Sequence, residues 1–305
     1  MAKCLIVLLG PTGVGKTDLS LNLSKRFGAP IISADSRQFF REMQIGTAAP
    51  TPAQLAQAKH YFVGHKSATE EYSCGSYETD ALTLLESEVF PKTDFAILTG
   101  GSMLYIDAVC NGIDDFPAPD LALREELTQR LEREGLDSIR MQLKMLDPVY
   151  YNQVDLKNPQ RILKGLEVTL QTGKPYSSFL TRQQKARPFT IIKIGLTRPR
   201  EELYQRINMR VDMMVAEGLV EEARSLLHLR NLNSLNTVGY RELFDYFDGT
   251  ISLQAAIELI KRNSRRYAKR QLTWWARDMQ IAWFHPDNIQ GISEQIEALA
   301  SKNDE

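Results

Sequence analysis

The first hundred residues alternate between short apolar runs and amphipathic segments. The apolar runs are residues 4–10, 30–35 and 95–101. A helical pattern follows the first run at 18–27 and the third at 102–109. One more apolar run, residues 190–197, lies much later in the chain. Apolar strands that alternate with turns and helices are typical of a parallel sheet with helical crossovers. The pattern therefore predicts an α/β core.

The segment 114–187 has a different residue pattern. It is dense in helix formers, as in LALREELTQRLEREG at 121–135, and prolines mark its ends at Pro117, Pro119 and Pro188. Proline-bounded changes of pattern are frequent at domain boundaries. We predict an all-helical insertion domain at 114–187, within a core domain formed by residues 1–113 and 188–305. After Pro199 the pattern is helical almost to Trp283.

Composition narrows the class of protein only slightly. The 305 residues are 43% hydrophobic and 25% charged, as in ordinary globular chains. The three cysteines are far apart with no CxxC pair, which argues against both a disulfide framework and a structural zinc site. No apolar run is long enough to cross a membrane. These features predict a cytoplasmic protein.

The net charge of −1 hides a strongly basic segment. Residues 261–277, KRNSRRYAKRQLTWWAR, contain seven basic side chains and no acidic one. Those at 261, 262, 265, 266, 269 and 270 recur at helical spacing, which places most of them on one face. Such a stripe suits the phosphates of a nucleic acid, although it can also be a merely solvated surface. Trp274 and Trp275 follow it, and either could stack on a base or belong to the core.

A phosphate-binding loop is the clearest motif. Residues 10–17, GPTGVGKT, match the pattern GxxxxGK[ST] between an apolar strand and an amphipathic helix. The glycines allow the backbone N–H groups to turn toward phosphates, Lys16 supplies charge, and the Thr17 hydroxyl suits Mg²⁺. We predict that Mg²⁺ is the cofactor and that the phosphates are bound by Gly10, Pro11, Thr12, Gly13, Val14, Gly15, Lys16 and Thr17.

The fate of that phosphate is open at this point. Kinases and NTPases normally carry a second strand that ends in an acidic residue, but the run FAIL ends at Thr99 with no carboxylate in the following residues 100–102. The run PIISAD ends in Asp35, at a strand end where α/β sheets bind their ligands. Asp35 can be a metal ligand, a base, or the N-cap of a helix.

A larger set of motifs resembles the bacterial tRNA dimethylallyltransferase family. In chain order they are GPTGVGKT, IISADSRQ, IGTAAPT, LTGGSMLY, NPQRILKGLEV, TGKP, REELYQRINMRVD, VGYRE and YAKRQLTWWAR. The resemblance implies a P-loop NTPase-like fold and a monomer. It implies transfer of a dimethylallyl group from dimethylallyl diphosphate to N6 of adenosine 37 of tRNA, beside the anticodon. The diphosphate then leaves as a whole, and no ATP is spent.

The resemblance also implies a role for individual residues. Thr12, Lys16, Asp35 and Arg210 match the catalytic positions, with Asp35 as the base. The tRNA anticodon stem-loop would contact Asp35, Ser36, Arg37, Gln38, Ser102, Arg124, Gln160, Arg161, Lys164, Gly239, Tyr240, Arg241, Lys269, Arg270, Gln271 and Arg277. Ala49 stands where the family commonly has lysine, which puts the role of that cation in doubt.

Three other functions remain open on sequence grounds. An adenylate isopentenyltransferase that prenylates free AMP or ATP would share the fold, but it needs no extended basic surface. A P-loop kinase for a small metabolite would consume ATP and tolerate loss of the basic segment. A non-catalytic RNA-binding GTPase or ATPase would transfer nothing.

Overall fold

The computed structural model describes residues 3–181 and 183–302, and the contacts within it divide the chain into two units. The core unit runs to Asn111 and resumes at Ala186, and the insertion is Gly112–Lys185. Each boundary lies two residues before the predicted one. Arg187, predicted to end the insertion, belongs to the core: its guanidinium donates to Glu78 at 2.7 Å and to the carbonyl oxygens of Ala108 and Val109.

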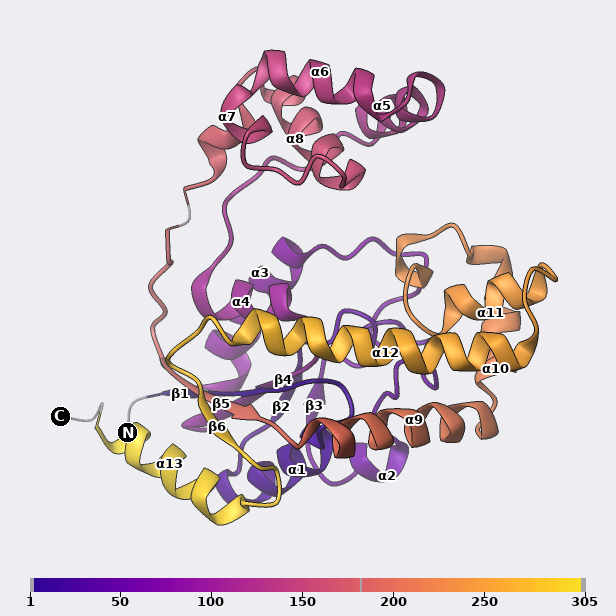
Figure 1. Ribbon diagram of the computed structural model, residues 1–305. Coiled ribbons are helices and arrows are strands. Elements are labelled where there is room, and N and C mark those ends of the chain that lie inside the picture. Colours follow the sequence, from indigo (N-terminus) through magenta and orange to yellow (C-terminus); the bar gives the residue numbers. More distant parts are fainter. Residues whose placement is uncertain (1–2, 182, 303–305) are drawn as a thin grey trace. The chain divides into compact units, whose positions relative to one another are not determined.

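One parallel sheet of six strands organises the core unit, in the order β3-β2-β4-β1-β5-β6 (Figure 1). The strands are β1 (Cys4–Leu9), β2 (Ile31–Ser33), β3 (His60–Tyr61), β4 (Phe95–Thr99), β5 (Thr190–Leu196) and β6 (Ala282–Phe284). The predicted α/β class and its four apolar strands are confirmed. The helical region predicted from Pro199 almost to Trp283 ends earlier, at Trp275, and residues 282–284 form β6, which is held by its pairing with β5.

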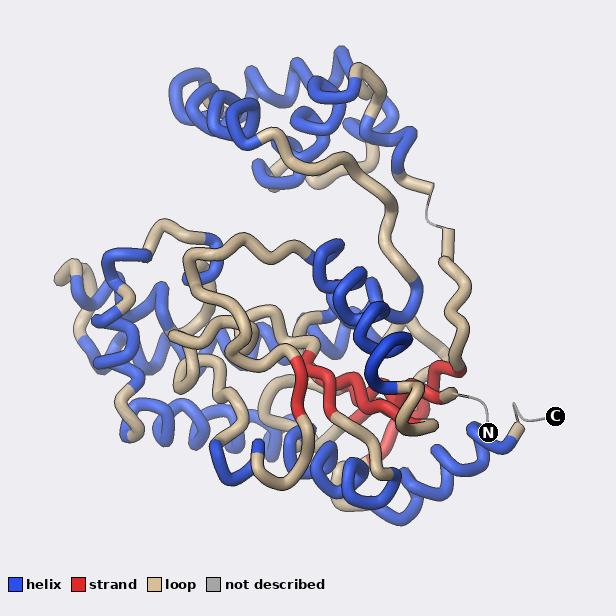
Figure 2. The backbone as a smooth tube through the Cα atoms, turned by 180° about the vertical axis from the view of Figure 1, so that it is seen from behind, coloured by secondary structure: helices blue, strands red, loops and turns tan. Residues whose placement is uncertain are grey.

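Helices cover both faces of the sheet, and the tube view shows the strands between them (Figure 2). In β1 the side chains of Leu5, Val7 and Leu9 enter one apolar cluster, while the intervening ones enter another. The first cluster includes side chains of α3 (Cys74–Leu84) and α4 (Met103–Asn111), and the second includes α1 (Lys16–Phe27), α9 (Arg200–Ala216) and α13 (Ile289–Ser301). Burial on both faces explains why the strand is apolar throughout.

The remaining helices of the core unit form a third apolar cluster. It joins side chains of α9, α10 (Leu219–Ser225), α11 (Tyr240–Phe247) and the long α12 (Leu253–Trp275). Phe40 and Met43, which follow β2, also enter it, whereas the adjacent Phe39 enters a cluster against the sheet. The segment after β2 is therefore anchored on both sides. This unit also contains a short α2 (Pro52–Leu55), a π-helical turn at Leu85–Val89 and two 3₁₀ turns at Leu227–Leu229 and Asn233–Leu235.

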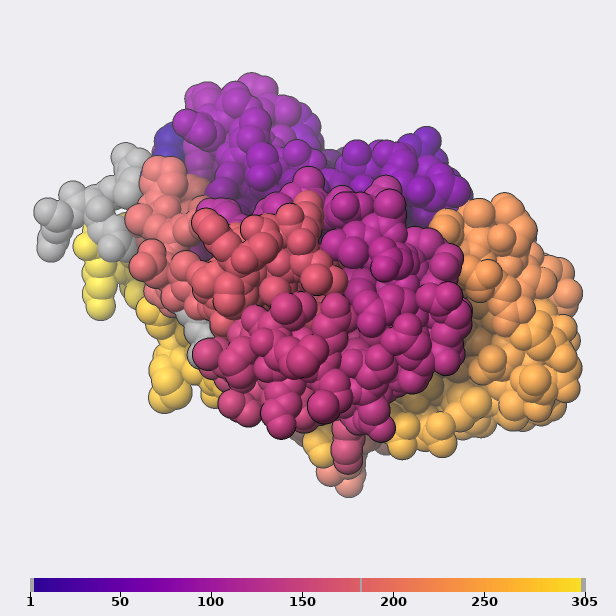
Figure 3. Space-filling view, turned by 90° about the horizontal axis from the view of Figure 1, so that it is seen from above, coloured from indigo at the N-terminus to yellow at the C-terminus, as the bar shows by residue number. Residues whose placement is uncertain are grey.

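The insertion has its own apolar core. Its helices are α5 (Leu121–Glu134), α6 (Leu136–Leu146), α7 (Pro148–Tyr151) and α8 (Pro159–Thr172), and they pack around Leu127, Ile139 and Leu166. In the space-filling view the atoms of this unit, coloured magenta to salmon, form one compact mass (Figure 3). Buried Asp147 accepts hydrogen bonds from the backbone N–H groups of Tyr150 and Ser177, which ties α7 to the end of the unit.

No helix in the part of the chain that the structure describes is both long and apolar enough to cross a membrane.

Candidate active site

The phosphate loop joins β1 to α1, at the carboxyl edge of a central strand. Gly10, Gly13 and Gly15 have φ angles of 148°, 81° and 111°, which other residues rarely adopt. A Cβ atom on Gly10 would lie 2.9 Å from the carbonyl oxygen of Leu196 in β5. Glycine is therefore required both for the turns and for the close approach of the loop to the neighbouring strand.

The ammonium group of Lys16 lies within this loop. Its Nζ atom donates to the carbonyl oxygens of Gly10 at 2.7 Å and Pro11 at 3.0 Å. Burial, and secondly the charge of Arg210, lower the pKa of Lys16 to about 7, while the charge of Asp35 acts in the opposite direction. Burial disfavours the charged amine because water no longer hydrates it. Lys16 thus titrates near neutral pH, and an incoming anion would favour its charged form.

Three arginines contact three successive residues of the loop. Arg210 reaches the Thr12 hydroxyl at 3.4 Å, Arg206 donates to the Gly13 carbonyl at 3.0 Å, and Arg198 donates to the Val14 carbonyl at 2.9 Å. The two carbonyl contacts hold these peptide oxygens on one side, so the N–H groups of the same peptides point away from the arginines. Arg206 was not singled out from the sequence. Its spacing of four from Arg210 places both on one helix face, which is the signal that indicates it.

Asp35 follows β2 and begins a turn. Its Oδ1 atom accepts a 3.0 Å hydrogen bond from the backbone N–H of Arg37, and residues 36–39 form turns rather than a helix. The alternative role as a helix N-cap is therefore wrong. Burial is the largest cause that lowers the pKa of both Lys16 and Arg210. The negative charge of Asp35 acts in the opposite direction on both groups. Asp35, Lys16, Arg210 and Thr12, which lie far apart in the chain, thus come together in the structure.

The turn after β4 packs tightly against Asp35. A Cβ atom on Gly100 would lie 2.3 Å from the carbonyl carbon of Ala34, and one on Gly101 would lie 3.2 Å from Oδ2 of Asp35. Ser102 accepts a 2.8 Å hydrogen bond from the backbone N–H of Ser36. The paired glycines therefore allow the ends of β2 and β4 to meet, and they leave one oxygen of Asp35 beside a bare backbone.

Gln271 connects three parts of the site. Its Oε1 atom accepts from the backbone N–H of Thr12 at 2.9 Å, and its Nε2 atom donates to the carbonyl oxygen of Gly101 at 2.8 Å. Tyr267, one helical turn earlier, donates to the same carbonyl oxygen at 2.8 Å. Gln271 is fully buried. As a correction to the predicted RNA contact, this side chain is committed to the protein and positions the phosphate loop.

Several other predicted RNA contacts are also engaged within the protein. Arg37 donates to the carbonyl oxygens of Asn233 and Ser234, and Gln38 donates to those of Thr47 and Ala48. These side chains fix the segment after Asp35 in place, which restricts what they can offer to another molecule.

The VGYRE motif contains both buried and exposed residues. Tyr240 is fully buried, and its hydroxyl donates to Glu222 at 2.7 Å. The backbone N–H of Gly239 donates to Glu242 at 2.8 Å. Tyr240 is therefore a core residue, which corrects its assignment as an RNA contact. Arg241 alone of the three predicted residues presents an exposed side chain.

Some cations of the basic stripe on α12 are engaged within the protein, and others are exposed. Lys261 forms an ion pair with Asp212 at 2.7 Å, and Arg265 donates to Asn208. The side chains that stay exposed are those of Arg262, Arg266, Lys269, Arg270 and Arg277. Of the six stripe cations, Lys261 and Arg265 are only partly exposed and are engaged within the protein, so the exposed positive edge of α12 consists of Arg262, Arg266, Lys269 and Arg270.

A pocket of about 530 Å³ lies beside this edge. It is lined by Met103, Arg266, Lys269, Arg270, Thr273, Trp274 and Arg277. Trp274 is 37% exposed and donates from Nε1 to Asp107 at 2.8 Å, whereas Trp275 is 2% exposed and belongs to the core. The sequence left base stacking and core packing open for both tryptophans. In the structure Trp274 can offer a ring face to a ligand, and Trp275 packs in the core.

In the insertion, the predicted RNA contacts differ in availability. Gln160 and Arg161 are exposed at the start of α8. Arg124 donates through Nε and Nη2 to buried Glu167, at 3.1 and 2.9 Å. Lys164 lies 4.0 Å from the same carboxylate, and burial lowers its pKa. Arg124 and Lys164 therefore first serve to neutralise Glu167.

A parallel sheet with a phosphate loop and arginines at the end of β1, and a carboxylate at the end of β2 two strands away, is typical of a phosphate-binding, group-transferring enzyme. Residues 38–278 match the family model described as IPP transferase. The chain is 55% identical over 299 residues to a tRNA dimethylallyltransferase of Phocaeicola vulgatus, covering 98% of this chain and 99% of the relative. It is 58% identical over 287 residues to one of Porphyromonas gingivalis, covering 94% and 95%.

Solved structures agree with these sequence matches. A tRNA isopentenylpyrophosphate transferase from Bacillus halodurans superposes with a TM-score of 0.70 at 33% identity, with all of both chains covered. A second match is to crystallographic snapshots of a eukaryotic dimethylallyltransferase acting on tRNA. This structure gives a TM-score of 0.77 at 27% identity and covers 90% of this chain and 70% of that one. The chain belongs to the IPP transferase family, and it is a prenyltransferase.

Proposed function

We propose that this enzyme transfers a dimethylallyl group from dimethylallyl diphosphate to N6 of adenosine 37 in tRNA and releases diphosphate. The observation that carries the proposal is the meeting of the phosphate loop with Asp35 at one edge of the sheet. An anion-binding cradle and a carboxylate base are the two groups that such a reaction needs.

The reaction forms a carbon–nitrogen bond, breaks a carbon–oxygen bond and moves one proton from nitrogen to a carboxylate. The N6 amine attacks the allylic carbon, the bond from that carbon to the diphosphate oxygen breaks with its electron pair, and Asp35 takes the proton from N6. Negative charge develops on the leaving diphosphate. Lys16 and Arg210, together with the N–H groups of the loop, stabilise this charge because they are in place before the reaction begins.

Mg²⁺ fits the site. The Thr17 hydroxyl lies at the start of α1, makes no hydrogen bond among residues 3–181 and 183–302, and would offer Mg²⁺ an oxygen ligand. In the same described residues no cluster of His, Cys, Asp and Glu side chains could hold a metal by itself. Mg²⁺ is commonly bound by few protein groups together with phosphate oxygens and water. When bound, it would neutralise part of the charge of the diphosphate.

The relatives named above favour tRNA over a free nucleotide as the acceptor, and the exposed cations of α12 support that choice. The proposal extends to the anticodon stem-loop as the bound part of the tRNA, and to a monomer that acts in the cytoplasm.

A direct assay tests the proposal. The protein is incubated with labelled dimethylallyl diphosphate and, in separate reactions, with bulk tRNA, with AMP, and with ATP plus metabolites. We expect label in adenosine of tRNA alone, with one diphosphate released per transfer and loss of activity in EDTA that Mg²⁺ restores. Label in AMP, or ADP and AMP formed in step with transfer, would contradict the proposal.

A further inference from the structure

The IGTAAPT motif, residues 45–51, begins with a loop whose backbone is bound by one carboxylate. Glu222 of α10 accepts the backbone N–H of Ile45 through Oε2 and that of Gly46 through Oε1, both at 2.8 Å. Its Oε1 atom also accepts the hydroxyl of Tyr240 at 2.7 Å. Hydrogen bonds to an ionised acceptor are stronger than those between neutral groups. Glu222 therefore fixes the orientation of two successive peptides of the loop.

The loop and α10 also meet through close packing. A Cβ atom on Gly46 would lie 2.6 Å from the hydroxyl oxygen of Tyr240, so a larger residue would push the loop away from the tyrosine. The side chain of Ile45 packs on the third apolar cluster, which contains Leu219 and Ala223 of α10. The contact between Glu222 and the loop is thus part of an ordered interface.

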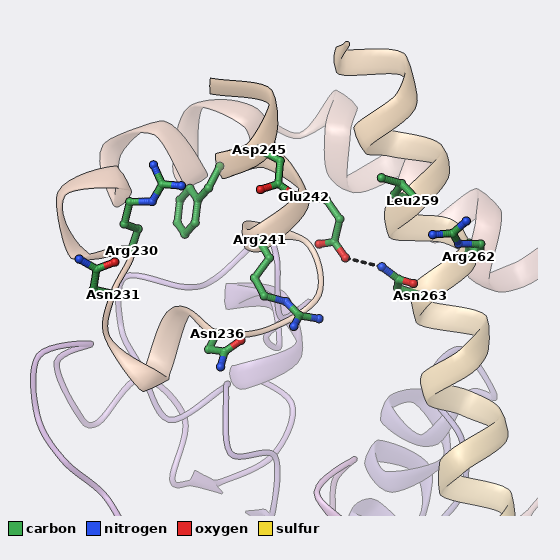
Figure 4. A pocket seen from close by; sticks show the side chains of 10 residues that line it. Arg230, Asn231, Asn236, Arg241, Glu242, Asp245, Leu259, Arg262 and Asn263 are labelled. Carbon is green, nitrogen blue, oxygen red and sulfur yellow. Dashed lines mark hydrogen bonds between the residues drawn. The ribbon is translucent and has the colours of Figure 1, made fainter. Parts of the chain in front are cut away.

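The first turn of α11 holds Tyr240 in its place. Buried Glu242 accepts the backbone N–H of Gly239 at 2.8 Å. It also accepts from Nδ2 of Asn263 in α12 at 2.7 Å, the bond drawn as a dashed line in Figure 4. The residue before Tyr240 is therefore connected to α12, and the tyrosine hydroxyl approaches Glu222 from an anchored helix end.

The carbonyl groups of the same loop face the active site. The carbonyl oxygen of Thr47 accepts from Nε2 of Gln38 at 3.2 Å and from Nη2 of Arg210 at 3.4 Å. Gln38 also donates to the carbonyl oxygen of Ala48 at 3.2 Å. In the described part of the chain, the other hydrogen bond of the Arg210 side chain is the one to the Thr12 hydroxyl. The Thr47 carbonyl is therefore one of two contacts that place Arg210 beside the phosphate loop.

The loop does not keep this shape by local preference. Ala48 has a φ angle of 45°, in the left-handed region that residues other than glycine rarely adopt. Such a conformation persists only where the surrounding structure determines it. The surroundings here are Glu222 on the N–H side of the loop, and Gln38 and Arg210 on the carbonyl side. Loss of the contacts on one side should let the loop relax and move those on the other.

We propose that Glu222 is a positioning residue, which holds Arg210 beside the diphosphate through the loop at residues 45–48. It acts on the Thr47 carbonyl and not on a substrate. Charges stabilise a transition state best when they are in place beforehand, and a small displacement of a positioned group reduces the rate strongly. The inference rests on the proposed function, since it assumes a diphosphate leaving group. It gives the IGTAAPT motif and buried Tyr240 a part in the reaction.

The test uses the full chain with the substitution Glu222→Gln. Glutamine has the same shape, but whichever way its amide is turned, its NH₂ group faces the N–H of Ile45 or that of Gly46. The matched control is Glu221→Gln, which removes the same charge from the neighbouring position of α10. Glu221 is exposed and makes no hydrogen bond or ion pair among residues 3–181 and 183–302.

Transfer kinetics and binding are measured well below the melting temperature of each protein. We expect Glu222→Gln to lower kcat/KM for dimethylallyl diphosphate by about tenfold to a hundredfold, as a displaced catalytic group does. Calorimetry with inorganic diphosphate and Mg²⁺, without RNA, should show binding weakened by roughly tenfold. The Kd for stem-loop RNA should stay unchanged, and Glu221→Gln should equal the wild type in every measurement. A lowered melting temperature with normal kcat/KM in Glu222→Gln overturns the proposal.

A double-substitution cycle decides whether Glu222 acts through Arg210. In the Arg210→Gln background, adding Glu222→Gln should reduce kcat/KM by no more than about twofold, because the group that it positions is already gone. Equal losses in the two backgrounds overturn the proposal, since the effect would then reach the site by another route. If Glu222→Gln does not fold by circular dichroism, Glu222→Asp takes its place in the cycle, because it keeps the charge but is one methylene too short to reach both peptides.

Failure of this inference can be told apart from failure of the proposed function. A wild type that transfers no dimethylallyl group to tRNA rejects the proposed function, and the same cycle run on the binding of inorganic diphosphate still tests Glu222. Normal transfer by both the wild type and Glu222→Gln leaves the proposed function standing and rejects only the positioning role.

Discussion

The side chain of Gln271 accepts a 2.9 Å hydrogen bond from the backbone N–H of Thr12, across 259 positions of sequence. The same side chain donates to Gly101 at 2.8 Å. One buried amide thus sets the distance between the phosphate loop and the turn beside Asp35.

Replacing Gln271 with leucine should impair both stability and transfer. The substitution leaves the Thr12 N–H without its partner, and an unsatisfied buried polar group costs about 1–3 kcal/mol. Urea denaturation should show a loss of that size, and KM for dimethylallyl diphosphate should rise. Tyr267→Phe, which removes only the second bond to Gly101, is the matched control and should have the smaller effect. An unchanged KM in Gln271→Leu would mean that the amide does not position the loop.

Asp35→Asn tests the base directly. Asparagine keeps an oxygen that can accept the N–H of Arg37, so the turn should persist, but it cannot take a proton. We expect kcat to fall by roughly 10²–10⁴ while the Kd for tRNA changes little. Single-turnover kinetics and anisotropy measure the two quantities. A normal kcat with only a lowered Tm would assign Asp35 a purely structural role.

Binding of dimethylallyl diphosphate should weaken as pH rises above neutral. The pKa of Lys16 is about 7 in the free protein, and the negative diphosphate should raise it in the complex. Binding then takes up a proton between these two values, so affinity is greatest below pH 7 and falls by up to about tenfold per pH unit above it. Calorimetry at pH 8 in buffers of different ionisation enthalpy should detect this uptake.

Lys16→Arg is the control for this pH dependence, because arginine stays charged throughout. Its affinity should not vary between pH 7 and 9, whatever its absolute value. A flat profile in the wild type over the same interval would show that Lys16 is already fully charged.

The exposed cations of α12 should determine how strongly RNA binding depends on salt. Each phosphate contact contributes about −0.7 to −0.9 to the slope of log K against log salt. Arg266→Ala with Arg270→Ala should therefore flatten the slope by about 1.5 and raise KM for tRNA, with little change in KM for dimethylallyl diphosphate. Lys261→Ala is the comparison, because this lysine is paired with Asp212 and should leave the slope unchanged. Equal slopes in all three proteins would make the stripe a solvated surface.

The sequence by itself determined the elements that have a strong local cause. The loop at residues 10–17 is specified by its glycines and by Lys16, and the strands β1, β2, β4 and β5 follow from apolar runs. The two short strands β3 and β6 could not be predicted, because two or three residues gain their structure only from pairing with β2 and β5.

Only the tertiary structure decided which predicted site residues face outward. Gln271, Tyr240 and Arg241 all lie in motifs of the resemblance, yet the first two are buried and the third is exposed. Likewise, Lys261 and Arg262 are adjacent cations, and within residues 3–181 and 183–302 only the first meets carboxylates, Glu258 of the same helix and, at the shorter distance, Asp212 of α9. Local pattern places a residue on a helix, but the partner that buries or neutralises it comes from a distant segment. Long-range packing is therefore what separates the residues that position this site from those that can touch a substrate.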